Sequence, residues 1–298
     1  MTSRHAFALA IVAALVAGPA LAQHQVTTRS NVEYVEHDGV KLTGDLYMPK
    51  GVAKAPIVIA IHGGGWQGGS PAAYRHWGPY YAKNGIGLFA IKYRLAKAGT
   101  YPKAAYDVKA AIQFVRAKAA ELGADPDRIG LQGDSAGGHL ASLIGIAPDE
   151  FKSAYQNAPH AAVPAGVKTV VSLYGIYDML AQWQHDQIAR PRDQISEKFL
   201  GVTPMQNRKL YFESSPLSYA TVDRNRTRFL LVHGTDDDIV DKAQAEQFWT
   251  ALNQAGFYSR RVILPGAGHF FASDPHDMPG SFSGMAAPRI LQFLQGQL

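Results

Sequence analysis

Short apolar runs that alternate with helical patterns are the feature of this sequence that most restricts its fold. The runs cover 57–61, 87–93, 129–132, 167–174, 229–232 and 262–264. Such runs are typical of strands covered on both faces, as in a parallel sheet. Between them, helical patterns cover 72–84, 103–122, 135–146, 241–255 and 281–298. The alternation predicts an α/β fold with a mostly parallel, twisted sheet and helices on both faces.

Two segments depart from this alternation. Residues 32–35 and 40–48 alternate around the turn dipeptide Asp38-Gly39, which predicts an antiparallel hairpin at the N-terminal side of the sheet. Residues 178–226 lack strand character and are too long for a plain loop, so we expect them to form a small helical cap inserted after a strand. No repeat or linker divides the chain, and 23–298 is predicted to be one catalytic domain.

The first 22 residues have the pattern of a secretory signal peptide. A positive start with Arg4 precedes an apolar run over 6–17, and the small-x-small tripeptide 20–22 follows a Gly-Pro pair. The run is too short to cross a membrane, which needs roughly 20 residues. We therefore expect cleavage before Gln23, a secreted or periplasmic protein, and no stable membrane insertion.

Composition restricts the chemistry. The chain has no cysteine, so a nucleophile must come from another residue type and thiolate metal sites are excluded. Its net charge is +5, but the densest basic stretch holds only Arg224, Arg226 and Arg228, too few for a nucleic-acid surface. His276 lies between two aspartates without a second ligand cluster, so no metal is expected. It is interpreted as a surface residue, as are His37, His76, His160 and His185.

The sequence Gly133-Asp134-Ser135-Ala136-Gly137 is the strongest local motif. It follows a predicted strand and precedes a predicted helix, the context in which G-x-S-x-G forms a sharp turn that exposes the serine hydroxyl. Ser135 is therefore the candidate nucleophile. A hydroxyl needs a base to take its proton, which requires a histidine oriented by a carboxylate.

Both partners follow later strands. His269 comes after a glycine-rich loop behind 262–264, and Asp236, Asp237 and Asp238 follow 229–232. The carboxyl ends of parallel strands meet at one edge of a sheet, where Ser135 is also expected. The three adjacent aspartates leave the acid open, and Asp178 is a fourth candidate.

A glycine-rich loop supplies the remaining part of a hydrolase site. His62-Gly63-Gly64-Gly65-Trp66 follows the strand 57–61. Its glycines let backbone amides approach a developing oxyanion, where preorganised donors are worth about 3 to 4 kcal/mol each.

With these motifs, the sequence resembles the α/β-hydrolase carboxylesterases with an HGGGW loop, similar to the bacterial feruloyl and acetylxylan esterase-like branch related to hormone-sensitive lipase. The resemblance covers nearly the whole chain after the signal segment and implies the α/β-hydrolase fold. Its HG-x-x-D-x-x-V pattern falls on Asp237, although Asp241 stands where the family usually has proline. It implies that Gly64, Gly65 and Ala136 supply the oxyanion amides, and that His62 and Asp134 hold their loops in shape.

The expected function is serine-dependent hydrolysis of a small-molecule carboxylic ester through an acyl-enzyme, without a cofactor. Small or aromatic acyl groups such as acetyl or feruloyl are expected. An amide hydrolase with the same triad is the alternative, followed by a non-catalytic binding protein. Several aromatic residues either line a substrate pocket or belong to the core: Trp66, Trp77, Tyr80, Tyr81, Tyr174 and Trp183. The oligomeric state has no signature in the sequence.

Overall fold

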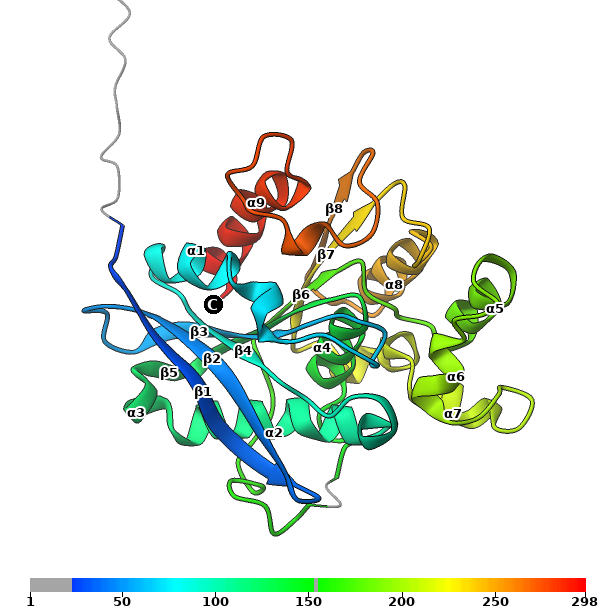
Figure 1. The fold of residues 1–298 in the computed structure, drawn as a ribbon, viewed down its shortest axis with the longest axis horizontal. Coiled ribbons are helices and arrows are strands. Elements are labelled where there is room, and N and C mark those ends of the chain that lie inside the picture. The colour runs from blue at the N-terminus through cyan, green and yellow to red at the C-terminus, as the bar shows by residue number, and fades with distance from the viewer. Residues whose placement is uncertain (1–22, 153–154) are drawn as a thin grey trace, which may run out of the picture.

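A single eight-stranded sheet organises the protein, and the computed structural model describes residues 23–152 and 155–298 (Figure 1). The predicted signal segment lies outside these residues. The strand order is β1-β2-β4-β3-β5-β6-β7-β8. The strands are β1 (Val26–His37), β2 (Val40–Pro49), β3 (Ala55–Ile61), β4 (Gly87–Ile91), β5 (Ala124–Asp134), β6 (Thr169–Leu173), β7 (Arg228–Gly234) and β8 (Ser259–Leu264).

The pairing of the strands matches the predicted architecture. Strands β1 and β2 form an antiparallel hairpin around Asp38-Gly39, and β2 pairs antiparallel with β4. All pairings from β4 through β3 to β8 are parallel. Every residue of β4 and β6 is buried. The sequence of β4 is apolar throughout, as expected for a strand covered on both faces, whereas β6 also buries Thr169 and Ser172. The α/β-hydrolase fold class is confirmed.

Helices cover both faces of the sheet (Figure 1). On one face, α2, α4 and α8 enclose a core that includes Val108, Leu140 and Phe248. On the other, α1 and α9 enclose a second core with Trp77 and Ile290. These helices, with the short α3, are α1 (Trp77–Lys83), α2 (Lys103–Ala117), α3 (Ala119–Leu122), α4 (Ala136–Ile146), α8 (Ala243–Gln254) and α9 (Phe282–Gln297).

Two of the predicted helices have different bounds in the structure. The pattern over 72–84 is a 3-10 turn, Pro71–Tyr74, followed by α1. The pattern over 103–122 is interrupted at Lys118, whose backbone (φ −102°, ψ 13°) separates α2 from α3. Gly123 ends the second piece at φ +75°, a conformation that favours glycine.

The segment between β6 and β7 contains three helices. They are α5 (Met179–Ala189), α6 (Ile195–Leu200) and α7 (Arg208–Glu213), followed by two 3-10 turns, Pro216–Tyr219 and Val222–Arg224. Figure 1 shows α5, α6 and α7 together at one end of the molecule, and we call residues 178–226 the cap. Asp178 begins α5 by accepting hydrogen bonds from the amides of Leu180 and Ala181.

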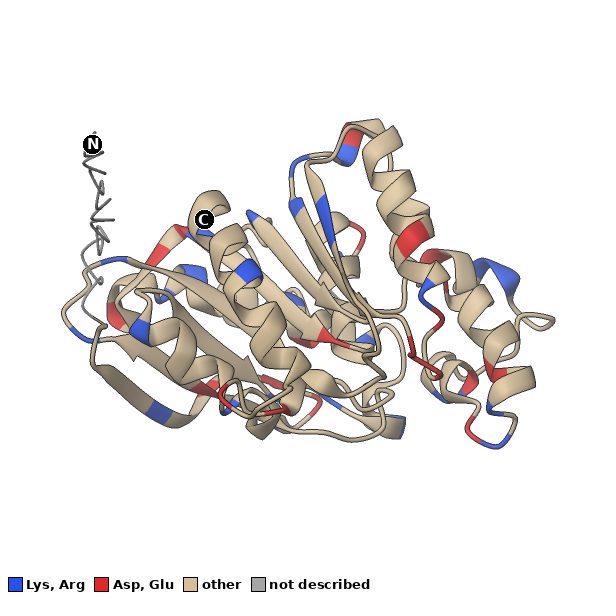
Figure 2. Ribbon diagram, turned by 90° about the horizontal axis from the view of Figure 1, so that it is seen from above, with Lys and Arg blue, Asp and Glu red and all other residues tan. Residues whose placement is uncertain are grey.

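Within the described residues, no helix is long and apolar enough to cross a membrane. Figure 2 shows basic and acidic residues distributed over both the sheet region and the cap.

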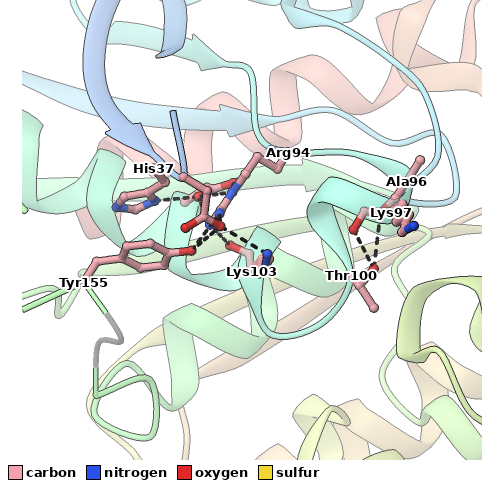
Figure 3. A network of polar contacts seen from close by, with 9 residues as sticks. His37, Arg94, Ala96, Lys97, Thr100, Lys103 and Tyr155 are labelled. Atoms are coloured by element: carbon pink, nitrogen blue, oxygen red, sulfur yellow. Dashed lines mark hydrogen bonds and ion pairs between the residues drawn. The ribbon is translucent and has the colours of Figure 1, made fainter. Parts of the chain in front are cut away.

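A buried polar network fastens the hairpin to the parallel part of the sheet (Figure 3). The Arg94 guanidinium, after β4, donates to Asp107 of α2 and to Asp38 at the hairpin turn. The His37 ring lies 2.7 Å from the Asp107 carboxylate. The interpretation of His37 as a surface residue is therefore wrong, since it is only 2% exposed. Its carboxylate partner lies on a helix far along the chain, and local polarity does not reveal such a contact.

Candidate active site

Ser135 lies on the sharp turn between β5 and α4. Its backbone has φ 53° and ψ −120°, a costly conformation for a residue with a side chain. The turn depends on the glycine two residues later, because a Cβ on Gly137 would lie 1.9 Å from the Ile61 carbonyl oxygen. The turn thus holds the serine at the carboxyl end of β5, as the motif predicts.

Three predicted side chains from three different strand ends meet in one hydrogen-bonded chain. His269 Nε2 lies 2.9 Å from Ser135 Oγ, and His269 Nδ1 lies 2.7 Å from Asp237 Oδ2. With its proton on Nδ1, the imidazole donates to the carboxylate and accepts from the serine hydroxyl. This is the arrangement in which a serine can be deprotonated as it attacks.

Asp237 is the carboxylate that reaches the histidine. Its Oδ1 accepts hydrogen bonds from the amides of Ile239 (3.0 Å) and Val240 (2.9 Å), which fix its position. Burial acts to raise the pKa of Asp237, but the hydrogen bonds from His233 and His269 outweigh it and lower the pKa below its ordinary value. The carboxylate therefore stays ionised and can stabilise a positively charged imidazole.

The other acid candidates have different partners. The Asp236 carboxylate accepts from the Thr235 hydroxyl. The backbone carbonyl of Asp238 contacts the His185 ring. Asp178 caps α5 and, through its backbone, contacts the Gln244 side chain. Of the four candidate aspartates, all of them among the described residues, only Asp237 contacts His269.

The loop 62–69 faces the serine turn. Gly64 and Gly65 have φ +112° and +59°. Among the loop and turn hydrogen bonds of the described residues, the amides of Gly64, Gly65 and Ala136 make none to a backbone carbonyl. These three amides are therefore available to a ligand beside Ser135, as an oxyanion site requires.

Buried polar contacts hold the loop in shape. The His62 ring contacts its neighbouring Gly63 carbonyl at 2.8 Å and stacks on Tyr93, whose hydroxyl donates to the His62 carbonyl. Burial lowers the pKa of His62 to about 4, so the ring is neutral near pH 7 and donates from Nδ1. Behind the serine, Tyr74 donates to Asp134, and burial raises the pKa of that carboxyl to about 6.

Trp66 connects this loop to the cap. Its ring stacks on Phe199 of α6 at a centroid distance of 4.3 Å, and His139 of α4 meets it edge-on at 5.1 Å. The His139 Nε2 also lies 2.7 Å from the Ser214 carbonyl of the cap. The candidate oxyanion loop, the helix after Ser135 and the cap are thus packed through one aromatic cluster.

A cavity of about 320 Å³ opens onto the three hydrogen-bonded side chains. The cap contributes four residues to it: Arg190, Asp193, Ile195 and Lys198. Phe270, directly after the histidine, also lines the cavity. Sequence patterns had not indicated these residues, and only the adjacency of Phe270 to His269 could have pointed to one of them.

The aromatic residues considered for this pocket lie elsewhere. Trp66, Trp77, Tyr81 and Tyr174 are fully buried, whereas Tyr80 and Trp183 pack at the edges of the two cores. None of the six lines the cavity in the part of the chain that the structure describes. These aromatic residues belong to the core or its edges, the second of the two alternatives that the sequence left open.

No cluster of three or more His, Asp or Glu residues suited to a metal ion occurs among residues 23–152 and 155–298. His276 instead packs edge-on against Trp77 and Tyr80.

The fold agrees with what comparisons with known proteins find. Residues 44–252 match the family model BD-FAE, so the chain belongs to that family. It is 32% identical over 205 residues to the probable carboxylic ester hydrolase LipM of Mycobacterium tuberculosis, covering 67% of this chain and 45% of LipM. It is also 32% identical to the esterase LipC of that organism over 250 residues, or 80% of this chain and 58% of LipC.

A solved structure extends the similarity to the whole fold. A truncated carbohydrate esterase from gut microbiota superimposes with a TM-score of 0.74 at 25% identity, covering 94% of this chain and 99% of that one. The resemblance to α/β-hydrolase carboxylesterases is thereby confirmed. The chain spans about half the length of the two mycobacterial relatives.

Proposed function

We propose that this protein is a serine-dependent carboxylic ester hydrolase. The observation that carries the proposal is the chain of contacts from Ser135 through His269 to Asp237, beside three available backbone amides. The names of LipM and LipC, an ester hydrolase and an esterase, support the same chemistry.

The proposed reaction uses each of these groups once per half-reaction. Ser135 Oγ attacks the ester carbonyl while His269 Nε2 takes its proton, and Asp237 stabilises the imidazolium. The amides of Gly64, Gly65 and Ala136 stabilise the oxyanion. Collapse of the tetrahedral intermediate expels the alcohol, which receives the proton from His269. Water then attacks the acyl-enzyme by the same route and releases the acid.

We further propose a small or aromatic acyl group, such as acetyl or feruloyl. A cavity of about 320 Å³ is at the low end for ligand pockets and favours a compact group. The name of the gut carbohydrate esterase is consistent with an acylated sugar as substrate.

Replacement of the nucleophile tests the function. Ser135→Ala should lower the hydrolysis of p-nitrophenyl acetate by roughly 10³-fold or more and abolish labelling by a fluorophosphonate. Ser142→Ala is a matched control, because this serine is buried on the same helix and its hydroxyl has no hydrogen-bond partner in the described structure. The control should retain activity and labelling.

Retained activity in Ser135→Ala would refute the serine mechanism. A preference for an N-formyl amine over an aryl acetate would favour the amide hydrolase instead. Failure of the unmodified protein to react with esters, amides and the fluorophosphonate would favour a binding protein.

The location is also a proposal. We propose export with cleavage after Ala22, supported by the charge and hydropathy pattern of residues 1–22. N-terminal sequencing of the protein from a producing cell should begin at Gln23, and an intact Met1 would contradict it.

A further inference from the structure

Phe270 is held in an unusual position beside the histidine. Its backbone φ is +69°, a left-handed conformation that residues with side chains rarely adopt. Its side chain is nevertheless 64% exposed, so core packing does not explain the conformation. The ring meets the His269 ring edge-on at a centroid distance of 4.6 Å and lines the cavity. An exposed aromatic face in a strained backbone at a reactive site indicates a binding role.

The cap side of the same cavity carries excess positive charge. Arg190 donates to Asp193 at 2.7 Å, so these two charges offset one another. The Lys198 side chain is exposed and has no hydrogen-bond or ion-pair partner among the described residues. The carboxylate of its neighbour Glu197 accepts a hydrogen bond from the Trp183 indole instead. The Lys198 ammonium is therefore free to contact an anionic ligand.

These two features lie where the alcohol part of an ester would be. His269 delivers its proton to the departing alcohol oxygen, so on the proposed mechanism the alcohol leaves from beside that ring. Phe270 is its direct neighbour, and an aromatic face stacks against flat ring surfaces.

We propose that Phe270, Arg190 and Lys198 form a subsite for an alcohol that contains a ring bearing a carboxylate. The ring stacks on Phe270, and the carboxylate contacts Lys198 and the outer edge of the Arg190 guanidinium. A sugar acid and an aromatic hydroxy acid share this chemistry. The subsite rests on the proposed esterase function, since it needs an ester alcohol beside His269.

Matched substrate pairs test the charge preference for each source. The aromatic pair is the anion 4-acetoxybenzoate and the neutral 4-acetoxybenzamide. The sugar pair is a mono-O-acetylated methyl glycoside of glucuronic acid, with its carboxylate free, and the corresponding neutral methyl glucoside. Acetate release gives kcat/KM for each. The anionic member of at least one pair should be favoured by roughly fivefold at low ionic strength, and the preference should shrink at high salt. The pair that responds identifies the ring.

Charge reversal links the preference to the cap. Lys198→Glu should lower the anionic-to-neutral ratio by roughly tenfold, because an attraction is replaced by a repulsion. Lys168→Glu is the matched control, because this exposed lysine precedes β6 at the opposite edge of the sheet from Ser135. In this variant the anionic-to-neutral ratio of kcat/KM should not change. Phe270→Ala should raise KM for the favoured ring ester more than for ethyl acetate.

Two results would overturn the subsite alone, and a third would overturn it together with the proposed function. One is a ratio near unity in both pairs for a protein that hydrolyses p-nitrophenyl acetate, which would leave the esterase proposal intact. The other is a ratio that Lys198→Glu leaves unchanged. If none of the esters is hydrolysed and fluorophosphonate does not label Ser135, the proposed function itself fails, and the subsite is refuted with it.

Discussion

Two buried histidines beside the candidate site, His62 and His139, should make the protein less stable as the pH falls from 7 to 5. His62 and His139 are 1% and 0% exposed, and burial lowers the pKa of each from 6.5 to about 4. Below pH 6.5 the unfolded chain therefore binds protons that the folded chain refuses, and stability falls as the pH falls. Between pH 7 and pH 5 this linkage costs about 2 kcal/mol for each histidine.

Of the two carboxyl groups of the site with shifted pKa values, only Asp134 changes the loss of stability between pH 7 and pH 5. Burial raises the pKa of Asp134 from 3.8 to about 6, so acidification relieves an unfavourable buried charge and returns about 1 kcal/mol over the same interval. Asp237, whose pKa is lowered by its two histidine partners despite its burial, loses its contribution only below pH 3.8 and does not affect this window. For His62, His139 and Asp134 together, the loss of unfolding free energy from pH 7 to pH 5 is about 2–3 kcal/mol, and His276, whose pKa burial also lowers to about 4, adds to this loss.

Urea unfolding at constant ionic strength, followed by circular dichroism at pH 7, 6 and 5, measures this loss. His139→Gln keeps an N–H that can donate to the Ser214 carbonyl but cannot be protonated. It should lower stability at pH 7, because the ring contacts are lost, yet make the loss between pH 7 and pH 5 smaller by about 2 kcal/mol. His24→Gln, at an exposed position, is the control and should keep the full loss. The same pH dependence in His139→Gln and the unmodified protein would refute the reasoning.

Three further substitutions have direct expectations. Asp237→Asn should lower kcat for p-nitrophenyl acetate by roughly 10⁴-fold with the fold preserved, because the histidine loses the partner that selects its tautomer; a loss below tenfold would argue against this acid. Gly137→Ala should prevent correct folding or abolish activity, because the new Cβ would lie 1.9 Å from a carbonyl oxygen, whereas Gly166→Ala meets no atom within 4 Å and should retain both in circular dichroism and activity assays. Trp66→Ala should destabilise the protein to urea by about 3–5 kcal/mol through the loss of its stack on Phe199, and an effect under 1 kcal/mol would show that the cap is not anchored there.

The parts of the fold that the sequence predicted are those determined by local pattern. Strands covered on both faces are mostly apolar, so the positions of β4 and β6 could be recognised although β6 also contains Thr169 and Ser172. The first residues of β5 could not be recognised as a strand from the sequence. β5 begins at Ala124 and includes the polar residues Asp125 and Asp127, whereas the apolar pattern begins only at Ile129. The serine turn was recognisable because its glycines are required by contacts that any such turn makes.

Contacts between distant segments could not be predicted in this way. His37 has polar neighbours in the sequence, and it is buried only because Asp107 on α2 meets it. The cap residues Arg190 and Lys198 reach the cavity because α6 packs against the loop 62–69 and α5 packs against α6, and no local periodicity encodes that packing. The choice among three adjacent aspartates likewise depended on which side chain turns inward, although the family pattern indicated Asp237.

The separation of the three reactive side chains along the chain has a consequence for how activity arises during synthesis and refolding. Ser135 follows β5, Asp237 follows β7 and His269 follows β8, which is the last strand and pairs only with β7 among the described strands. On the proposed mechanism, no ester is cleaved until that edge strand has joined the sheet. A growing chain therefore has no esterase activity even after most of its core residues have been synthesised. Recovery of hydrolysis after denaturation should time this final, non-local pairing and not the initial collapse.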